Sequence, residues 1–537
     1  MWTWAQTTER SRRFGNALLA AGSKVPIERE FLDGHESGQD HVGIYAENSN
    51  CWLEAFLGAF KARVAPFNVN YRYVAEELRY LLTNASCRFL VIQEKFVPIL
   101  AEIRSELPDL EVIFQIADGS GHPLLPGAVD FEEALAASSP QRPEPQLMGG
   151  DWSADDLYIL YTGGTTGMPK GVLWRQADIG VSAMGMRNSA TGSEFESIAD
   201  GVAYATSGGS LVTLPAAPYM HGAGQWIAFL SWYRGGPVVI QDHVDRLDPA
   251  DLWSVVARHR VQFLQIVGDA FGRPLVEELE RAIVAGEPYD TSSVAVVLSG
   301  GAALSEGLKK RFLAVIAKVI IIDGIGSSEA GGQMQNVSMG VSASTGTFPA
   351  APGNHVLAED LSSELSPGHE GMGWLAKSGR LPLGYLGDEA KTAKTFFSVG
   401  GVRFSVPGDR ARLLPGSAAS FGFPIVELHG RDSVTINSGG EKIFAEEVEA
   451  ALLTHPSVYD VVVAGRPSER WGSEVVAIVS LSAGAAATDE ELLNAASQKV
   501  ARYKLPKAII RVDAVMRSPS GKADYRWAKA IAGGETA

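Results

Sequence analysis

The sequence predicts an α/β protein with a large N-terminal body and a small α+β C-terminal domain. Its 537 residues are 46% hydrophobic and 20% charged, so the chain can bury several cores and is not disordered overall. Over residues 4–322, strand-like apolar runs alternate with helix-like segments, which is typical of largely parallel sheets. After Gly371 the pattern changes to short strands and turns, and a further break near Gly430 precedes a mixture of strands and helices.

Apolar spacing predicts the elements in order along the chain. Residues 4–21 have helical spacing and form the first expected helix. Further helices are expected at residues 51–61, 76–82, 445–453 and 490–502. Strands are expected at residues 41–46, 89–92, 157–161, 238–241, 294–298, 458–464, 475–481 and 508–512. Residues 138–151 carry Pro140, Pro143 and Pro145 and predict a surface connection between two lobes of the body.

Charge and cysteine content exclude several classes of protein. Lys and Arg total 46 against 62 Asp and Glu, a formal charge of −16, which argues against a nucleic-acid partner. Cys51 and Cys87 cannot form a disulfide framework and fit a reducing compartment. The N-terminus has no secretory signal pattern, and the strongest apolar run, residues 312–322, contains Lys318 and is too short for a transmembrane segment. The sequence therefore predicts a cytoplasmic protein.

Residues 161–171 form the most informative segment, Tyr-Thr-Gly-Gly-Thr-Thr-Gly-Met-Pro-Lys-Gly. Glycines allow a tight turn whose N–H groups converge on an anion, and threonine hydroxyls and a lysine add donors. The candidate phosphate-binding residues are Thr162, Gly163, Gly164, Thr165, Thr166, Gly167 and Lys170. The segment is not a Walker A loop, because a proline precedes the lysine and no Ser or Thr follows it. A solvated hairpin rich in turn-forming residues is the alternative interpretation.

This segment resembles the signature loop of the adenylate-forming superfamily, which includes acyl-CoA synthetases, luciferases and peptide-synthetase adenylation domains. The usual pattern is Tyr-Thr-Ser-Gly-Thr-Thr-Gly-x-Pro-Lys-Gly, from which only Gly163 departs. The resemblance covers almost the whole chain. Family members usually carry a further segment before the position of Thr3, so either a short natural start or a truncated reading frame is expected here. It implies an N-terminal AMP-binding domain over residues 1–430, containing a small distorted β-barrel, and a mobile cap domain over residues 431–537.

The resemblance also implies roles for residues in the body. The run Ser299–Ala303 matches the adenine-binding turn, which assigns Gly300, Gly301 and Ala302 to the nucleotide. In the run from Asp323 to Glu329, Asp323 and Gly324 are expected beside adenine, Ser328 near the α-phosphate and Glu329 as a magnesium ligand after a glycine turn. Thr166 is the second implied magnesium ligand. His221 is expected to position the substrate carboxylate, and not to act as a general base.

Further matches lie nearer the C-terminus. Asp409 is expected to accept from the ribose hydroxyls, and Arg431 matches the hinge arginine near ribose and phosphate, with Ser433 at the hinge position itself. Gly439 and Gly440 match the loop that borders the CoA channel. Lys522, in Pro-Ser-Gly-Lys, matches the adenylation lysine. The four residues expected to carry the chemistry are Lys522, Glu329, His221 and Lys170.

The implied activity is that of an ATP-dependent acyl-CoA ligase acting on a medium- or long-chain or steroid-side-chain carboxylic acid through an acyl-adenylate. ATP, Mg²⁺ and CoA are the implied cofactor and co-substrates. Small residues such as Ala223 and Gly332 near the expected acyl site indicate room for a bulky or long acyl group. A stand-alone adenylation enzyme that loads a carrier protein, a luciferase-like oxygenase and a catalytically silent acyl-adenylate sensor are alternatives, and homo-oligomer formation stays open.

Overall fold

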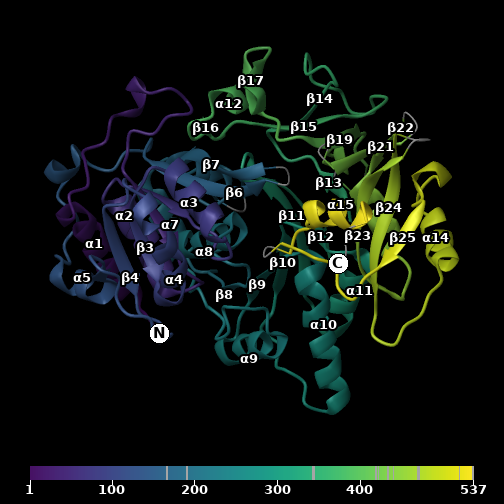
Figure 1. The fold of residues 1–537 in the computed structure, drawn as a ribbon, viewed down its shortest axis with the longest axis horizontal. Helices are drawn as coiled ribbons and strands as arrows, with labels where there is room; N and C mark the ends of the chain where they lie inside the picture. The colour runs from purple at the N-terminus through teal and green to yellow at the C-terminus, as the bar shows by residue number, and fades with distance from the viewer. Residues whose placement is uncertain are drawn as a thin grey trace.

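The computed structural model describes residues 1–164, 167–188, 191–340, 345–417, 420, 422–431, 434–438, 441–468, 472–518 and 521–534. The elements from α1 to β13 make up the left and centre of the molecule in Figure 1, and the last strands and helices lie on the right. The strands of the described chain form four groups, and each group packs against its own apolar core.

The first group is an eight-stranded sheet in the order β16-β7-β6-β2-β1-β3-β4-β5. Its strands are β1 (His41–Tyr45), β2 (Ala65–Asn68), β3 (Cys87–Gln93), β4 (Val112–Ile116), β5 (Val129–Asp130), β6 (Leu157–Gly164), β7 (Gly167–Arg175) and β16 (Gly384–Tyr385). The helices of this part are α1 (Trp4–Ala20), α2 (Asn50–Lys61), α3 (Ala75–Asn84), α4 (Val97–Ile103), α5 (Phe131–Ala137) and α6 (Gln176–Ser182). Strands β6, β2, β1, β3, β4 and β5 are parallel, and β1 is buried along its whole length, as expected for a strand covered on both faces.

The second group is a five-stranded sheet in the order β12-β11-β10-β9-β8, parallel except for the hairpin of β11 and β12. Its strands are β8 (Thr213–Pro215), β9 (Phe263–Ile266), β10 (Val296–Gly300), β11 (Ile320–Ser327) and β12 (Gly331–Ser338). Its helices are α7 (Ile198–Thr206), α8 (Gly222–Tyr233), α9 (Pro249–His259), α10 (Gly268–Ala285) and α11 (Glu306–Val315). Parallel strands bring their carboxyl ends to one edge, where α/β proteins bind ligands.

The third group lies where the resemblance implied a small distorted barrel, and it is a seven-stranded antiparallel sheet. It contains β13 (Thr347–Pro349), β14 (Asn354–Leu357), β15 (Gly373–Ser378), β17 (Phe396–Val399), β18 (Val402–Ser405), β19 (Asp409–Leu414) and β20 (Ile425–Arg431), with α12 (Glu389–Thr395) before β17. The predicted change to short strands after Gly371 is therefore confirmed.

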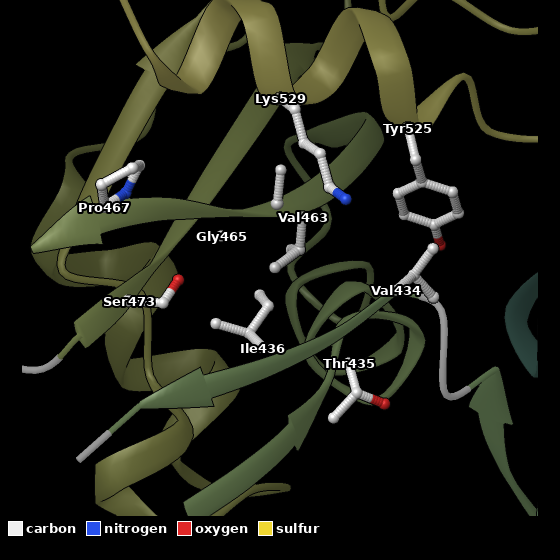
Figure 2. Close-up of a pocket in the computed structure, with 10 residues that line it drawn as sticks. Val434, Thr435, Ile436, Val463, Gly465, Pro467, Ser473, Tyr525 and Lys529 are labelled. Carbon is white, nitrogen blue, oxygen red and sulfur yellow. The ribbon is translucent and has the colours of Figure 1, made fainter. Parts of the chain in front are cut away.

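The C-terminal part has the α+β composition that the sequence predicts. Its elements are β21 (Thr435–Ser438), β22 (Glu441–Phe444), α13 (Ala445–Leu452), β23 (Val458–Ser468), β24 (Gly472–Leu481), α14 (Asp489–Ser497), β25 (Ala508–Arg511) and α15 (Tyr525–Ala532). Its two apolar clusters draw all their members from residue 434 onward. A pocket of about 340 Å³ lies in this part, and Figure 2 shows Tyr525 and Lys529 extending from α15 toward Val463 on β23 and Val434 just before β21.

Most expected elements are confirmed with ends displaced by a few residues, but two predictions are wrong. Residues 238–241 do not form a strand; Val238 makes a single bridge to Thr213. Pro237 has no N–H and β8 ends at Pro215, so the pairing cannot extend. Helix α14 ends at Ser497 and not at residue 502, because the next residues turn away and Arg502–Lys504 forms a separate short helix. Within the described residues, no helix is both long and apolar enough to cross a membrane.

Candidate active site

A cavity of about 700 Å³ opens among the first three groups of strands and the C-terminal part. Residues from distant parts of the sequence line it, and seven of the predicted site residues are among them. These seven are Thr162, His221, Gly300, Gly301, Gly324, Ser328 and Lys522. The sequence therefore identified residues that the fold brings to one place.

One wall of this cavity is a face of helix α8. Its lining residues Gly222, Ala223, Trp226, Ile227 and Leu230 follow the i, i+1, i+4, i+5, i+8 spacing of a single helical face. Arg234, the C-cap of α8, also lines the cavity. The twelve-residue interval from Gly222 to Arg234 corresponds to about 18 Å along the helix axis. The cavity therefore extends along the length of α8.

A buried hydrogen-bond chain fixes the aromatic residue of this wall. The Trp226 Nε1–H donates to the Tyr158 hydroxyl at 3.1 Å, and that hydroxyl donates to Gln225 Oε1 at 2.7 Å. Gln225 Nε2 donates in turn to the backbone oxygen of Tyr219 at 2.6 Å. Because Tyr158 and Gln225 are fully buried, this chain holds the indole in one orientation.

His221 lies at the opposite end of the α8 wall from Arg234, at the helix N-cap. Burial lowers the pKa of its imidazole to about 3, and the positive charges of Lys522 and Arg72 act in the same direction. Its Nε2 atom is buried and has no hydrogen-bond partner in the described part of the chain. A neutral ring of this kind can contact a substrate carboxylate but cannot serve as a cation near pH 7.

Lys522 reaches the cavity from the C-terminal part on a tight hairpin. The hairpin is closed by the bridge between Arg517 and Ala523, and Ser518 N–H donates to the Lys522 carbonyl at 2.7 Å. Arg517 binds Asp460 through two nitrogens, at 2.7 and 2.5 Å, which braces this turn. Gly521 is needed here because its φ is +74° and a Cβ would lie 3.2 Å from Ala270 of α10. The lysine Cε lies 3.9 Å from the position of a Cβ on Gly301, so it faces the predicted adenine turn.

The predicted phosphate loop is the end of a β-hairpin. Strand β6 leads into it and β7 leaves it, with Thr162 opposite Lys170 across the ladder. Thr162 lines the cavity, whereas Thr165 and Thr166 lie outside the described residues. Lys170 Nζ binds Asp388 Oδ2 at 2.7 Å and lies 5.6 Å from the centre of the Tyr385 ring. This hydrogen bond lowers the pKa of Asp388 and holds a lysine charge beside the hairpin.

Glu329 occupies the turn between β11 and β12, next to the cavity-lining Ser328. The expectation that it follows a glycine turn is wrong: Gly324 and Gly326 lie inside β11, which continues to Ser327. The glycines allow close pairing of β11 with β12, since a Cβ on Gly326 would lie 2.4 Å from the Gly331 carbonyl. The Tyr385 hydroxyl donates to Glu329 Oε1 at 2.9 Å. The lone carboxylate of Glu329 fits what Mg²⁺ requires of a protein site, since this ion binds one or two carboxylates together with substrate oxygens and water.

The predicted nucleotide-binding residues are only partly assembled around the cavity. Gly300 and Gly301 line it, but Ala302 packs against the core of the second group of strands. Asp323 binds the fully buried Lys309, which also donates to Thr345 Oγ1 at 2.8 Å. Burial raises the pKa of Asp323, and the adjacent Lys309 opposes that rise.

Two further predicted residues, Asp409 and Arg431, lie outside the lining of this cavity. Asp409 begins β19 opposite Arg431 at the end of β20, and neither residue lines the cavity. Gly439 and Gly440 lie outside the described residues.

Sequence reasoning missed three residues around the predicted ones: Tyr385, Asp388 and Lys309. Lys170 and Asp388 are 218 residues apart, so no local pattern joins them. The available sequence signal was the position of Asp388 directly before a short helix, which is typical of an N-cap residue. In the structure Asp388 caps α12 by accepting from the Lys391 N–H. Lys309 gave no signal, because a lysine on a helix is normally exposed.

Comparison with known proteins agrees with this geometry. The sequence profile described as "AMP-binding enzyme" matches residues 1–386, and "AMP-binding enzyme C-terminal domain" matches residues 447–522. The chain is 53% identical over 528 residues to the medium-chain acyl-CoA ligase Mig of Mycobacterium avium, covering 98% of this chain and 93% of that protein. It is 39% identical over 533 residues to a 3-oxocholest-4-en-26-oate–CoA ligase of Rhodococcus rhodochrous, covering 98% and 90%.

Solved structures support the fold. The anthranilate CoA ligase AuaEII in complex with anthranoyl-AMP superposes with a TM-score of 0.77 at 21% identity, covering 98% of this chain and 92% of that one. ATP-bound MatB from Rhodopseudomonas palustris gives 0.76 at 22% identity, covering 98% and 93%. The two sequence profiles and the relatives that match along nearly the full length lead to one assignment, and the shared fold agrees with it. The chain belongs to the family of AMP-binding, adenylate-forming enzymes and, within it, to the acyl-CoA ligases.

Proposed function

We propose that this ligase activates a medium- or long-chain or steroid-side-chain carboxylic acid with ATP and transfers the acyl group to CoA. The observation that carries the proposal is the single cavity that joins Lys522 and His221 to the elongated α8 wall. The names of the relatives support the substrate class, since they include medium-chain, medium/long-chain and 3-oxocholest-4-en-26-oate ligases.

In the first step, a carboxylate oxygen attacks the α-phosphorus of ATP and pyrophosphate leaves. Both reactants are negative, so positive groups must offset their repulsion. Lys522, which lines the cavity, would meet the charge that develops on the phosphorus, and Lys170 of β7 would act on the terminal phosphates that the hairpin is proposed to hold. Glu329, with Thr166 as its proposed companion, would hold Mg²⁺, which supplies further charge neutralisation on the phosphates. His221 remains neutral and orients the carboxylate.

In the second step, the thiol of CoA attacks the acyl carbon and AMP leaves. We assign residues 1–430 to the AMP-binding domain and residues 431–537 to a cap that rotates about Arg431 and Ser433. Rotation would withdraw Lys522 and bring Gly439 and Gly440 to the CoA channel. The contact between Arg273 of α10 and the ring of Tyr459, 5.0 Å apart, would break in this movement.

Pyrophosphate release from ATP, measured with saturating Mg²⁺ and a panel of carboxylic acids, tests the proposal. We expect release that depends on a medium-chain, long-chain or steroid-side-chain acid, and an acyl-CoA product with free CoA and no carrier protein. Product formation only on a carrier protein would overturn the CoA assignment. Nucleotide binding without pyrophosphate release from any acid would instead indicate a silent sensor, and activity on acetate alone would contradict a large acyl site.

We place the reaction in the cytoplasm. Cys51 and Cys87 are both free thiols, and burial raises the pKa of each to about 12, so both stay protonated and unreactive. Two unpaired thiols suit a reducing compartment.

A further inference from the structure

Two arginines line the end of the cavity that is farthest from His221 along α8. Arg234 caps the C-terminus of α8, and Arg187 comes from the hairpin closed by its bridge to Glu194. Gly185 of the same segment approaches α8 closely, since a Cβ there would lie 3.1 Å from Leu230. Both arginines therefore line the distal end of the cavity, where Arg234 is half-buried and Arg187 is exposed.

Positive charge accumulates at this end. Burial lowers the pKa of Arg234, and the neighbouring Arg187 lowers it further. Lys377 is close enough to Arg187 for the same effect, and burial together with this repulsion lowers its pKa to about 8. Glu194 is the nearby carboxylate, but Arg380 engages both of its oxygens, at 3.1 and 2.6 Å.

The Arg234 side chain keeps donor capacity that the protein does not satisfy. Its Nε atom is buried and has no hydrogen-bond partner in the described part of the chain. Buried donors of this kind normally find a partner, and a charged donor without one is especially unfavourable. The wall between the two ends of the cavity is apolar, with Ala223, Ile227 and Leu230 facing inward. A fully aliphatic substrate long enough to reach the end would remove water from this guanidinium and offer nothing in return.

We propose that Arg234, assisted by Arg187, recognises an oxygen atom at the end of the acyl substrate distant from the reacting carboxylate. This inference rests on the proposed acyl-CoA ligase function and deepens it. The shared chemistry is a hydrogen-bond acceptor, supplied by a keto or hydroxyl oxygen or by a second carboxylate. A planar guanidinium offers several N–H donors in a fixed arrangement, so it suits each of these groups. The arginines are specificity-determining residues and take no part in the adenylation chemistry.

Matched substrates test this role. The measured quantity is the kcat/KM of an oxygenated acid divided by the kcat/KM of its unsubstituted counterpart. One series compares 16-hydroxyhexadecanoate and hexadecanedioate with hexadecanoate. The other compares a steroid-side-chain acid that has a ring keto group with the same acid without it. For the wild-type protein we expect a ratio of about tenfold or more, the usual effect of a hydrogen bond to a charged group. If both the neutral and the anionic oxygenated acids are preferred, the site accepts any hydrogen-bond acceptor. If only the dicarboxylate is preferred, the site recognises a second carboxylate.

The Arg234→Met variant keeps the aliphatic stem and removes the donors. We expect its ratio to fall to near one, with a smaller fall for Arg187→Met. The matched control is Arg246→Met, since Arg246 is exposed and pairs with Asp245 away from the cavity. A wild-type ratio of one, or a ratio that Arg234→Met leaves unchanged, would overturn the inference. If no acid supports pyrophosphate release, the proposed function itself fails, which is a different result from activity without discrimination.

Discussion

Replacing Lys522 with methionine tests the central geometry of the proposed adenylation step. Methionine keeps most of the length of the side chain and removes its charge. Lys522 lies in the cavity close enough to His221 for its charge to lower the pKa of that ring. A unit charge about 4 Å from charge developing on phosphorus is worth roughly 4 kcal/mol at an effective dielectric constant near 20. Loss of one positioned donor at such a site typically costs on the order of 10²–10³ in rate. We therefore expect Lys522→Met to slow acid-dependent pyrophosphate release by about that factor.

The assay separates the two half-reactions. Initial pyrophosphate release reports adenylation, and acyl-CoA formation from a preformed acyl-adenylate reports thioester formation, which should keep most of its rate in the variant. Lys529→Met is the matched control, because Lys529 belongs to the same part of the chain but lines the separate pocket of Figure 2. If pyrophosphate release falls by less than about tenfold, or if both half-reactions fall together, Lys522 does not contribute the proposed stabilisation.

Three other outcomes follow from the same structure. Tyr385→Phe removes the hydroxyl that donates to Glu329. The Mg²⁺ concentration for half-maximal pyrophosphate release should therefore rise about tenfold, the usual effect of losing a residue that orients a metal ligand. An unchanged Mg²⁺ dependence would contradict this role. Because the pKa of His221 is about 3, His221→Asn should lower the adenylation rate by the same factor at pH 5.5 and pH 8, and a factor that changes across this range would mean that the imidazole titrates there. Burial and the adjacent Glu446 raise the pKa of Glu449 above its ordinary value of 4.5, so the folded protein holds a proton that the unfolded chain has lost. That contribution to stability is present at low pH and is lost as the pH rises through the folded-state pKa. The melting temperature of Glu449→Gln relative to wild type should therefore increase from pH 5 to pH 9, and a constant difference would refute the assignment.

The sequence predicted local structure well, because local structure depends on short-range patterns. Helix α1 begins at Trp4 as expected, since Thr3 and Gln6 form a capping box there. The Gly-Thr segment and the Ser-Gly-Lys motif could be recognised because each carries its chemistry within a few residues. The sequence did not show that β11 continues through Gly324 and Gly326, because only the pairing partner β12 makes an extended glycine-rich segment favourable.

Partners from distant parts of the chain could not be predicted in the same way. The salt bridge of Lys309 with Asp323 depends on how α11 packs against β11, and a lysine on a helix gives no indication that it will be buried. The sequence predicted the α8 wall only in part. It identified the small residues near His221. That one face of α8 lines the cavity and ends at Arg234 is seen only in the folded protein. Helical spacing across residues 222–234 was the signal that could have revealed it.

The proposed rotation of the C-terminal domain is energetically reasonable because the domain does not share its core with the body. Every member of its two apolar clusters lies at residue 434 or beyond, so a change of orientation need not expose either cluster. What changes is the contact between the two parts, including Arg273 on Tyr459 and Gly521 against Ala270. A half-exposed cation–π pair contributes only about 0.5–1 kcal/mol. The charges of Lys170, Asp388 and Glu329, by contrast, are held within the body, joined through Tyr385. Lys522 is thus the charge of the proposed adenylation site that would move with the domain, and the proposed rotation would couple the chemistry of the first step to domain orientation.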